Sequence, residues 1–168
     1  AFASGLFIFA DADLKFDQTC VAVGLLHDMD FERHPNLEAS DNGHPFVGVA
    51  YLRENGWSEE VCRAILSHAD YSGVPAVSPM EKTLRAVDEL SGFVTAVALV
   101  RPDKSIQSVE VSSVRKKMKD RAFAAKVRRE DIVHGAEELG MPLEEVIQEV
   151  ILALRDEAEL LGLAGTSG

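Results

Sequence analysis

Residues 78–100, SPMEKTLRAVDELSGFVTAVALV, carry the signals of one long α-helix. Ser78 is a favoured N-cap residue, Pro79 follows it at the first helical position, and Glu81 stands where the acidic member of a capping box belongs. Pro102 disfavours helical geometry in the residue before it, so the helix is expected to end close to residue 100. These signals predict a long helix in the middle of the chain.

Helical patterns also lie on both sides of this segment. Residues 17–28 are nearly all apolar and too long for a typical strand, which is typical of a helix buried on every side. Ser58 is a suitable N-cap for a further helix, in which Ile65 and His68 lie on one inward face. The remaining helices are expected at residues 44–56, 112–125, 129–140 and 143–163. No segment alternates like a half-buried strand, so the predicted fold class is all-α.

Length and composition favour one helical bundle with a small-molecule partner. The chain has 168 residues, 46% of them hydrophobic, which is enough for one sizeable core. Its formal net charge of −11 repels nucleic acid and anionic membranes, so neither is an expected partner. A small anionic substrate remains compatible with this charge, because a bound divalent metal reverses the local field.

The cysteines and the first residues indicate a cytoplasmic protein. Cys20 and Cys62 lie inside apolar helical patterns and lack the spacing of a zinc or redox pair, so buried reduced thiols are expected. The opening AFASGLFIFA, residues 1–10, is too short to span a membrane and has no basic region before it. We expect it to be the tail of a core helix rather than a secretory signal.

Five side chains that are able to bind metal lie between residues 27 and 88. They are His27, Asp28, His44, His68 and Asp88. Apart from the adjacent first pair, each lies on or beside a different predicted helix, and facing helices of a bundle project ligands into a shared core. Imidazole and carboxylate together suit Mn, Fe, Co, Ni or Zn better than calcium. The set therefore predicts a metal centre.

Each of these residues also has a plainer interpretation. A single histidine on an apolar face, such as His68, is more often a hydrogen-bonded core residue than a ligand. His44 fits beside an N-cap, and a mid-helix carboxylate such as Asp88 usually faces solvent. Leu84 and Gly92 lie on the same side of the helix as Asp88, which argues against a solvated position. The five residues together favour the metal interpretation.

The ordered series resembles the HD superfamily of metal-dependent phosphohydrolases. The resemblance begins with the doublet in LLHDMD, residues 25–30, and continues through HPFVGVAYLRENGWSEEVCRAILSHADYSGVP and EKTLRAVDELSG. It covers residues 15–105, and the segment RPDKSIQSVEVSSVRKKMKDRAFAA is similar to an uncharacterised bacterial subgroup. The resemblance implies a single HD-type domain, with the metal-site core at residues 15–105 and a C-terminal helical extension at residues 106–163.

The resemblance also implies how the ligands are used. His27, Asp28 and Asp88 would bind the shared metal, and His44 and His68 look like the additional histidines of members that hold a second metal. This order is similar to bacterial HD-type diadenosine tetraphosphate hydrolases and to the cyclic-dinucleotide phosphodiesterase branch. The family pattern starts with a further metal-binding histidine upstream of the doublet, at a position before residue 1 of this sequence, so that ligand either precedes the residues given or is missing from the protein.

The expected function is metal-dependent hydrolysis of a small phosphate ester or nucleotide by metal-activated water. The cofactor would be one or two divalent ions, with Mn, Fe, Mg, Co, Ni and Zn all open. The runner-up substrate is a cyclic or linear phosphodiester. A non-catalytic metal-binding or ligand-sensing module is the alternative from another class, and a homodimer through the C-terminal amphipathic helix is a third.

Several other polar residues are candidates for the same reaction. Asp28 is placed to bridge two ions and orient the attacking water, while Glu89, Asp30 and Asp70 are candidates to support the ligands, although each is more often an ordinary solvated carboxylate. Arg101 and Lys104 follow the long helix and are candidate phosphate clamps, and Gly92 would leave room for substrate above the metals. For the basic cluster Arg115, Lys116, Lys117 and Lys119, a solvated face is favoured over phosphate binding.

Overall fold

The computed structural model describes residues 18–37 and 42–165 of the chain. The expectations for residues 1–10 and for Asp17 lie outside this range. Seven α-helices and two short 3-10 helices make up the regular structure of the described residues, which contain no strand. They are α2 (Gln18–Leu26), α3 (Phe46–Glu54), α4 (Glu59–Ser67), η1 (Asp70–Ser72), α5 (Pro79–Leu99), η2 (Ile106–Ser108), α6 (Val111–Met118), α7 (Arg129–Leu139) and α8 (Leu143–Asp156). The predicted all-α class is confirmed.

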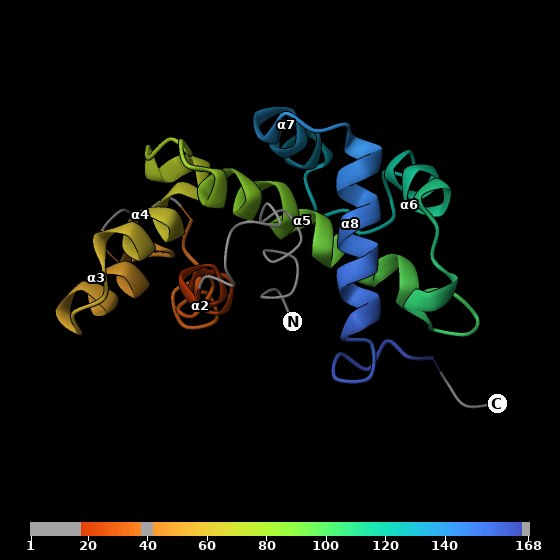
Figure 1. The fold of residues 1–168 in the computed structure, drawn as a ribbon, viewed down its shortest axis with the longest axis horizontal. Coiled ribbons are helices and arrows are strands. Elements are labelled where there is room, and N and C mark those ends of the chain that lie inside the picture. Colours follow the sequence, from red (N-terminus) through yellow and green to blue (C-terminus); the bar gives the residue numbers. More distant parts are fainter. Residues whose placement is uncertain (1–17, 38–41, 166–168) are drawn as a thin grey trace.

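α5 is the central helix, and its start is set by the predicted capping box. The backbone N–H of Glu81 donates to Ser78 Oγ at 3.2 Å, and Glu81 Oε2 accepts from the backbone N–H of Ser78 at 2.9 Å. α5 packs against α4 near its start and against α6, α7 and α8 farther along. Figure 1 shows α2, α3 and α4 gathered at one end of α5, with α6 and α8 at the other. The helix thus connects the two halves of the bundle.

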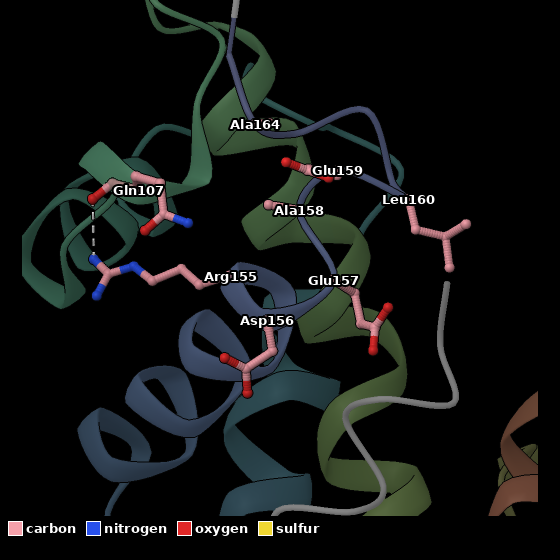
Figure 2. Close-up of a pocket in the computed structure, with 8 residues that line it drawn as sticks. All are labelled: Gln107, Arg155, Asp156, Glu157, Ala158, Glu159, Leu160 and Ala164. Atoms are coloured by element: carbon pink, nitrogen blue, oxygen red, sulfur yellow. Dashed lines mark hydrogen bonds between the residues drawn. The ribbon is translucent and has the colours of Figure 1, made fainter.

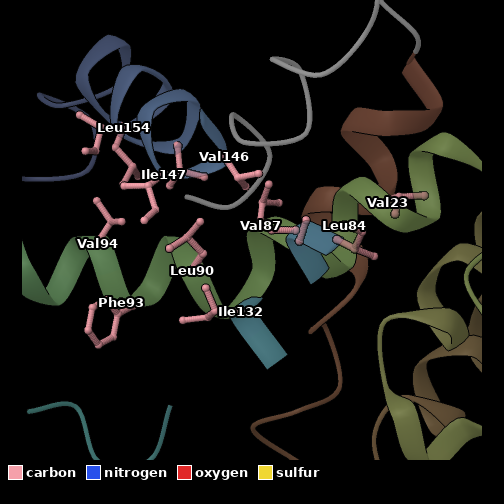
Figure 3. Packing of buried hydrophobic residues seen from close by; sticks show 14 of the residues in the cluster. Val23, Leu84, Val87, Leu90, Phe93, Val94, Ile132, Val146, Ile147 and Leu154 are labelled. Atoms are coloured by element: carbon pink, nitrogen blue, oxygen red, sulfur yellow. The ribbon is translucent and has the colours of Figure 1, made fainter. Parts of the chain in front are cut away.

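One hydrophobic cluster runs through both halves, from Val23 of α2 to Leu163 after α8. Figure 3 shows Leu90 and Val94 of α5 pointing toward Ile147 of α8, whereas Phe93 points away from α8. On the α7 side, Gly135 allows close contact, because an added Cβ there would lie 2.8 Å from the Cα of Ala86. Apolar residues with helical spacing therefore form the shared core that the sequence predicted.

Two predicted helices end earlier than their apolar patterns suggested. The helix expected at residues 112–125 ends at Met118, because Asp120 Oδ1 accepts from the backbone N–H groups of Ala122 and Phe123 and closes a turn. The helix expected at residues 143–163 ends at Asp156. There the chain folds back, and Leu163 O accepts from the backbone N–H of Ile106 at 2.9 Å. In both places local or tertiary hydrogen bonds replace continued helix.

Smaller differences concern the helix boundaries near the predicted metal residues. The helix expected at residues 17–28 ends at Leu26, so His27 and Asp28 follow it in a turn. The helix expected at residues 44–56 begins at Phe46 and ends at Glu54, with Gly56 beyond it at a positive φ of 78°. The predicted cap at Ser58 is confirmed, since Ser58 Oγ accepts from the backbone N–H of Val61. These shifts place His27 and Asp28 just after α2, and His44 just before α3.

Two further expectations concern the cysteines and membrane-spanning helices. Cys62 is buried as predicted, Cys20 is half-buried, and both are free thiols. No helix among the described residues is long and apolar enough to cross a membrane.

Candidate metal centre

His27 is fixed in the turn that follows α2. Its backbone N–H still donates to Val23 O at 3.0 Å, and its ring Nδ1 donates to Gly24 O at 3.0 Å. The side chain is only 2% exposed. Its Nε2 lies 3.3 Å from Asp28 Oδ2 and 3.4 Å from Asp88 Oδ1. The end of α2 therefore aims one imidazole nitrogen at two carboxylates.

His44 is held by a buried carboxylate. Its Nδ1 lies 2.7 Å from Asp30 Oδ1, and the other oxygen of Asp30 accepts from the backbone N–H of Gly48 at 2.7 Å. Gly48 is needed there, because an added Cβ would lie 2.9 Å from the Asp30 carboxyl carbon. Tyr71 adds a hydrogen bond from its hydroxyl to His44 O at 2.9 Å. With Nδ1 engaged, His44 Nε2 faces the cluster.

His68 caps the end of α4, and its Nδ1 donates to Ile65 O. Its Nε2 lies 3.1 Å from His44 Nε2. Since both rings use Nδ1–H as a donor, the two Nε2 atoms present lone pairs to one another. Such a contact is repulsive between neutral imidazoles and becomes favourable when a positive charge lies between them.

Asp28 lies between two groups of ligand atoms. Its Oδ2 lies 3.3 Å from His27 Nε2, while its Oδ1 lies 3.4 Å from His44 Nε2 and 3.9 Å from His68 Nε2. In each of two groups, His27–Asp28–Asp88 and Asp28–His44–His68, all three ligand atoms lie within 4.8 Å of one another. Asp28 is thus shared between two groups that could each hold an ion.

The distances fit metal coordination. Ligand atoms sit about 2.0–2.2 Å from a zinc-sized ion, so two atoms on the same ion lie roughly 3 Å apart. The contacts of 3.1 Å between His44 and His68 and of 3.3 Å between His27 and Asp28 match that separation. Asp28 is 43% exposed, whereas the histidines are buried, so the cluster opens to solvent on the Asp28 side.

The electrostatics of the cluster favour charged carboxylates beside the imidazoles. Burial alone would lower the pKa of His27, but hydrogen bonds and charges from Asp28 and Asp88 raise it to about 10. Burial would raise the pKa of Asp28, but the hydrogen bond and charge of His27 lower it, with smaller contributions from His68 and His44. Burial lowers the pKa of His68 and keeps its ring neutral, the form that binds metal.

Glu89 and Gly92 both lie on α5 close to Asp88, as the sequence suggested. Glu89 is half-buried, and burial raises its pKa, with further increases from the charges of Asp88, Asp131 and Asp28. Gly92 is exposed one turn after Asp88, and an added Cβ there would meet nothing within 4 Å. Glu89 and Gly92 therefore lie close to the cluster on a part of α5 that is not fully buried.

The predicted phosphate clamps are not brought to this cluster. Arg101 lies beyond the end of α5, about 20 Å along the helix axis from Asp88, and donates to Ser108 Oγ at 2.6 Å. Lys104 lies in the following turn at a φ of 49°. Asp70 pairs with Arg85 on the surface and does not support a ligand. The length of the helix predicted for residues 78–100 already implies this separation.

Two aromatic residues beside the cluster had no sequence signal of their own. Phe31 meets the His44 ring edge to face with the ring centroids 5.3 Å apart, and Tyr71 reaches the His44 carbonyl. Burial raises the pKa of the Tyr71 hydroxyl to about 12, helped by the charges of Asp30, Asp28 and Asp88. Only the fold shows that these rings flank a candidate ligand.

A separate pocket of about 630 Å³ lies at the end of α8 (Figure 2). Arg155 lines it, but its guanidinium donates to the carbonyls of Gln107 and Val109 and therefore has a structural role. The other charged residues around it are acids, including Asp156 and Glu159. This pocket lacks the combination of imidazoles and carboxylates found at the cluster.

Comparisons of the chain with protein-family models, with curated proteins and with solved structures gave no match.

Proposed function

We propose that the protein is a divalent-metal-dependent phosphohydrolase of the HD type that acts on a small phosphate ester or nucleotide. The observation that carries this proposal is the position of Asp28, whose two oxygens face two different ligand groups. A carboxylate shared between two ions is typical of sites that hydrolyse phosphate esters. The resemblance of the HD doublet and its ordered partners to that superfamily supports the same activity.

The residues of the cluster fit one or two divalent metal ions. His27, Asp28 and Asp88 would hold one ion, and Asp28, His44 and His68 the other. Bound divalent ions would lower the pKa of a water molecule and neutralise charge on the phosphate. The mixed imidazole and carboxylate ligands are compatible with Mn, Fe, Co, Ni or Zn, and Mg remains an option.

The protein side chains have separate parts in this proposal. Asp28, as the exposed member of the cluster, accepts a hydrogen bond from the attacking water and orients it toward phosphorus. Asp30 keeps His44 in one tautomer and one orientation. Burial raises the pKa of Glu89, which favours a role for this residue as proton donor to the leaving-group oxygen.

A non-catalytic metal-binding module is the second candidate, and the deep burial of His27 and His44 favours it. A structural site closes its coordination shell with protein ligands, whereas a catalytic site keeps a position open to solvent. The exposure of Asp28 supports the catalytic alternative. Metal content with no hydrolysis of any phosphate ester would favour the module.

Removal of metal should distinguish a metal-dependent phosphohydrolase from a non-catalytic metal-binding module. We expect the purified protein to bind about one to two transition-metal ions per chain, measured by mass spectrometry of the metals. Hydrolysis of p-nitrophenyl phosphate should stop after chelation and return with Mn²⁺ or another divalent ion. Bis-p-nitrophenyl phosphate, assayed in parallel, tests the phosphodiester alternative. Equal hydrolysis with and without chelator would contradict the proposal.

Asp30→Asn should weaken metal binding without unfolding the protein. The amide oxygen can still accept one hydrogen bond, but it lacks the charge that fixes the His44 tautomer and makes the ring a better ligand. Loss of such a supporting carboxylate typically costs about 10- to 100-fold in metal affinity. Isothermal titration with Zn²⁺ measures this, with exposed Asp156→Asn as a matched control. Unchanged affinity would show that Asp30 has no such role.

A further inference from the structure

Phe31 lies in the same turn as Asp28 and contacts the same histidine. The backbone N–H of Phe31 donates to Asp28 O at 3.0 Å, and a turn closed in this way places side chains three residues apart on one side. Asp28 Oδ1 lies 3.4 Å from His44 Nε2, and the Phe31 ring meets the His44 ring with the centroids 5.3 Å apart. Phe31 is 42% exposed and the Asp28 side chain 43%. Both side chains are therefore beside His44 and accessible to a bound molecule.

Tyr71 brings a second ring to His44 from another segment of the chain. It lies in η1, which begins two residues after His68, and its hydroxyl donates to His44 O at 2.9 Å. The residue is 42% exposed. We call Phe31 and Tyr71 the aromatic rim. The aromatic rim thus consists of two solvent-accessible rings that contact one candidate metal ligand.

The position of the aromatic rim restricts what it can bind. His44 belongs to the ligand group that it forms with Asp28 and His68, so a phosphate held by that group lies next to the residue that both rings contact. Only the part of a substrate attached close to its phosphate can reach rings at this position. Aromatic rings pair with other rings edge to face or offset, at centroid distances of about 4.5–7 Å. A flat ring one or two bonds beyond the ester oxygen meets both requirements.

From these contacts we propose that the aromatic rim binds a ring in the organic group of the substrate, so that the preferred substrate is the phosphate monoester of an aryl or arylmethyl alcohol. The inference rests on the proposed function, because it assigns a substrate class to the same metal centre. In the reaction the oxygen of water bonds to phosphorus and the bond from phosphorus to the ester oxygen breaks. The alcohol leaves with one proton of the water, and inorganic phosphate retains the other. Phe31 and Tyr71 bind the ring and determine specificity without taking part in these bond changes.

The test compares benzyl phosphate with glycerol 1-phosphate at a fixed concentration of free Mn²⁺. Both are esters of primary alcohols, so the same type of bond breaks in each. We expect kcat/KM to be about tenfold higher for benzyl phosphate. Cyclohexylmethyl phosphate, the saturated counterpart, should be hydrolysed less efficiently than benzyl phosphate, because it lacks the ring that pairs with the aromatic rim. Equal or better hydrolysis of the saturated ester would overturn the aromatic class.

Variants of the rim should change this preference selectively. Phe31→Leu keeps an apolar side chain and should raise KM for benzyl phosphate about fivefold with little change in kcat, while glycerol 1-phosphate changes less than twofold. Tyr71→Phe keeps the ring and should keep the preference, whereas Tyr71→Leu should lower it. Trp57→Leu is the matched control. Trp57 is 41% exposed, but it precedes α4 whereas His68 follows it, and α4 is about 13.5 Å long.

A second readout does not depend on turnover. Benzylphosphonate, which has no ester bond to hydrolyse, should bind the Mn²⁺-loaded protein more tightly than methylphosphonate in isothermal titration, and Phe31→Leu should weaken only the former. Thermal melting of each variant monitors the fold. Equal losses for both esters would show that the rings merely support His44 and would overturn this inference alone. Absence of metal-dependent hydrolysis of either ester would overturn the proposed function, and the phosphonate titration would still test the rings.

Discussion

Asp28→Ala should abolish both metal binding and turnover. Asp28 contributes one oxygen to each of the two ligand groups, so its loss leaves two incomplete pairs of ligands. We expect kcat for p-nitrophenyl phosphate to fall by about a thousandfold or more, because the side chain also orients the attacking water. Metal content measured on the purified variant should fall toward zero in parallel.

Thermal melting of the variant distinguishes the loss of metal binding and turnover from unfolding. Asp28 is partly exposed and lies outside the hydrophobic cluster, so its truncation should not open a cavity. In the metal-free state the variant should therefore melt close to the unaltered protein. Asp156→Ala changes an exposed acid on α8 and should retain both metal and activity. Full turnover in Asp28→Ala with an intact fold would refute the assignment.

The helical framework could be predicted because its signals are local. The capping box at Ser78 and Glu81 sets the start of α5 through hydrogen bonds within one turn, and the sequence alone places them. The ends of α6 and α8 were not predictable in the same way. Asp120 stops α6 with a side-chain turn, and α8 gives way to a segment that pairs with Ile106, a residue distant in sequence. An apolar pattern does not reveal such competing hydrogen bonds.

For the candidate site, the residue types were informative and the distances were not. The ordered series of histidines and aspartates named the five members of the cluster, which the fold brings together. The sequence named Asp28 as the bridging carboxylate and Asp30 as a candidate supporting residue, but it did not show that Asp30 would be buried against His44. Arg101 was an equally reasonable candidate by charge, but the length of α5 carries it away from Asp88. Which polar residues converge depends on tertiary packing.

Asp88→Ala should have a different consequence from Asp28→Ala. Asp88 belongs only to the group with His27, whereas His44 and His68 keep their positions and still share Asp28. We therefore expect the variant to lose one of two bound ions and to lower kcat by about 100- to 1000-fold, since charge stabilisation at one side of the phosphate is lost. Titration with Mn²⁺ should show half the original stoichiometry.

The reciprocal variant His68→Ala makes this comparison sharper. It removes a ligand from the other group and leaves His27, Asp28 and Asp88 in place, so it should also retain one ion. If Asp88→Ala loses all metal while His68→Ala keeps one ion, binding is sequential and the group with His27 is filled first. Two ions and undiminished turnover in Asp88→Ala would contradict the assignment of Asp88 as a ligand. A single ion bound to the unaltered protein would instead contradict a two-ion centre, because only simultaneous occupation of both groups requires Asp28 to bridge.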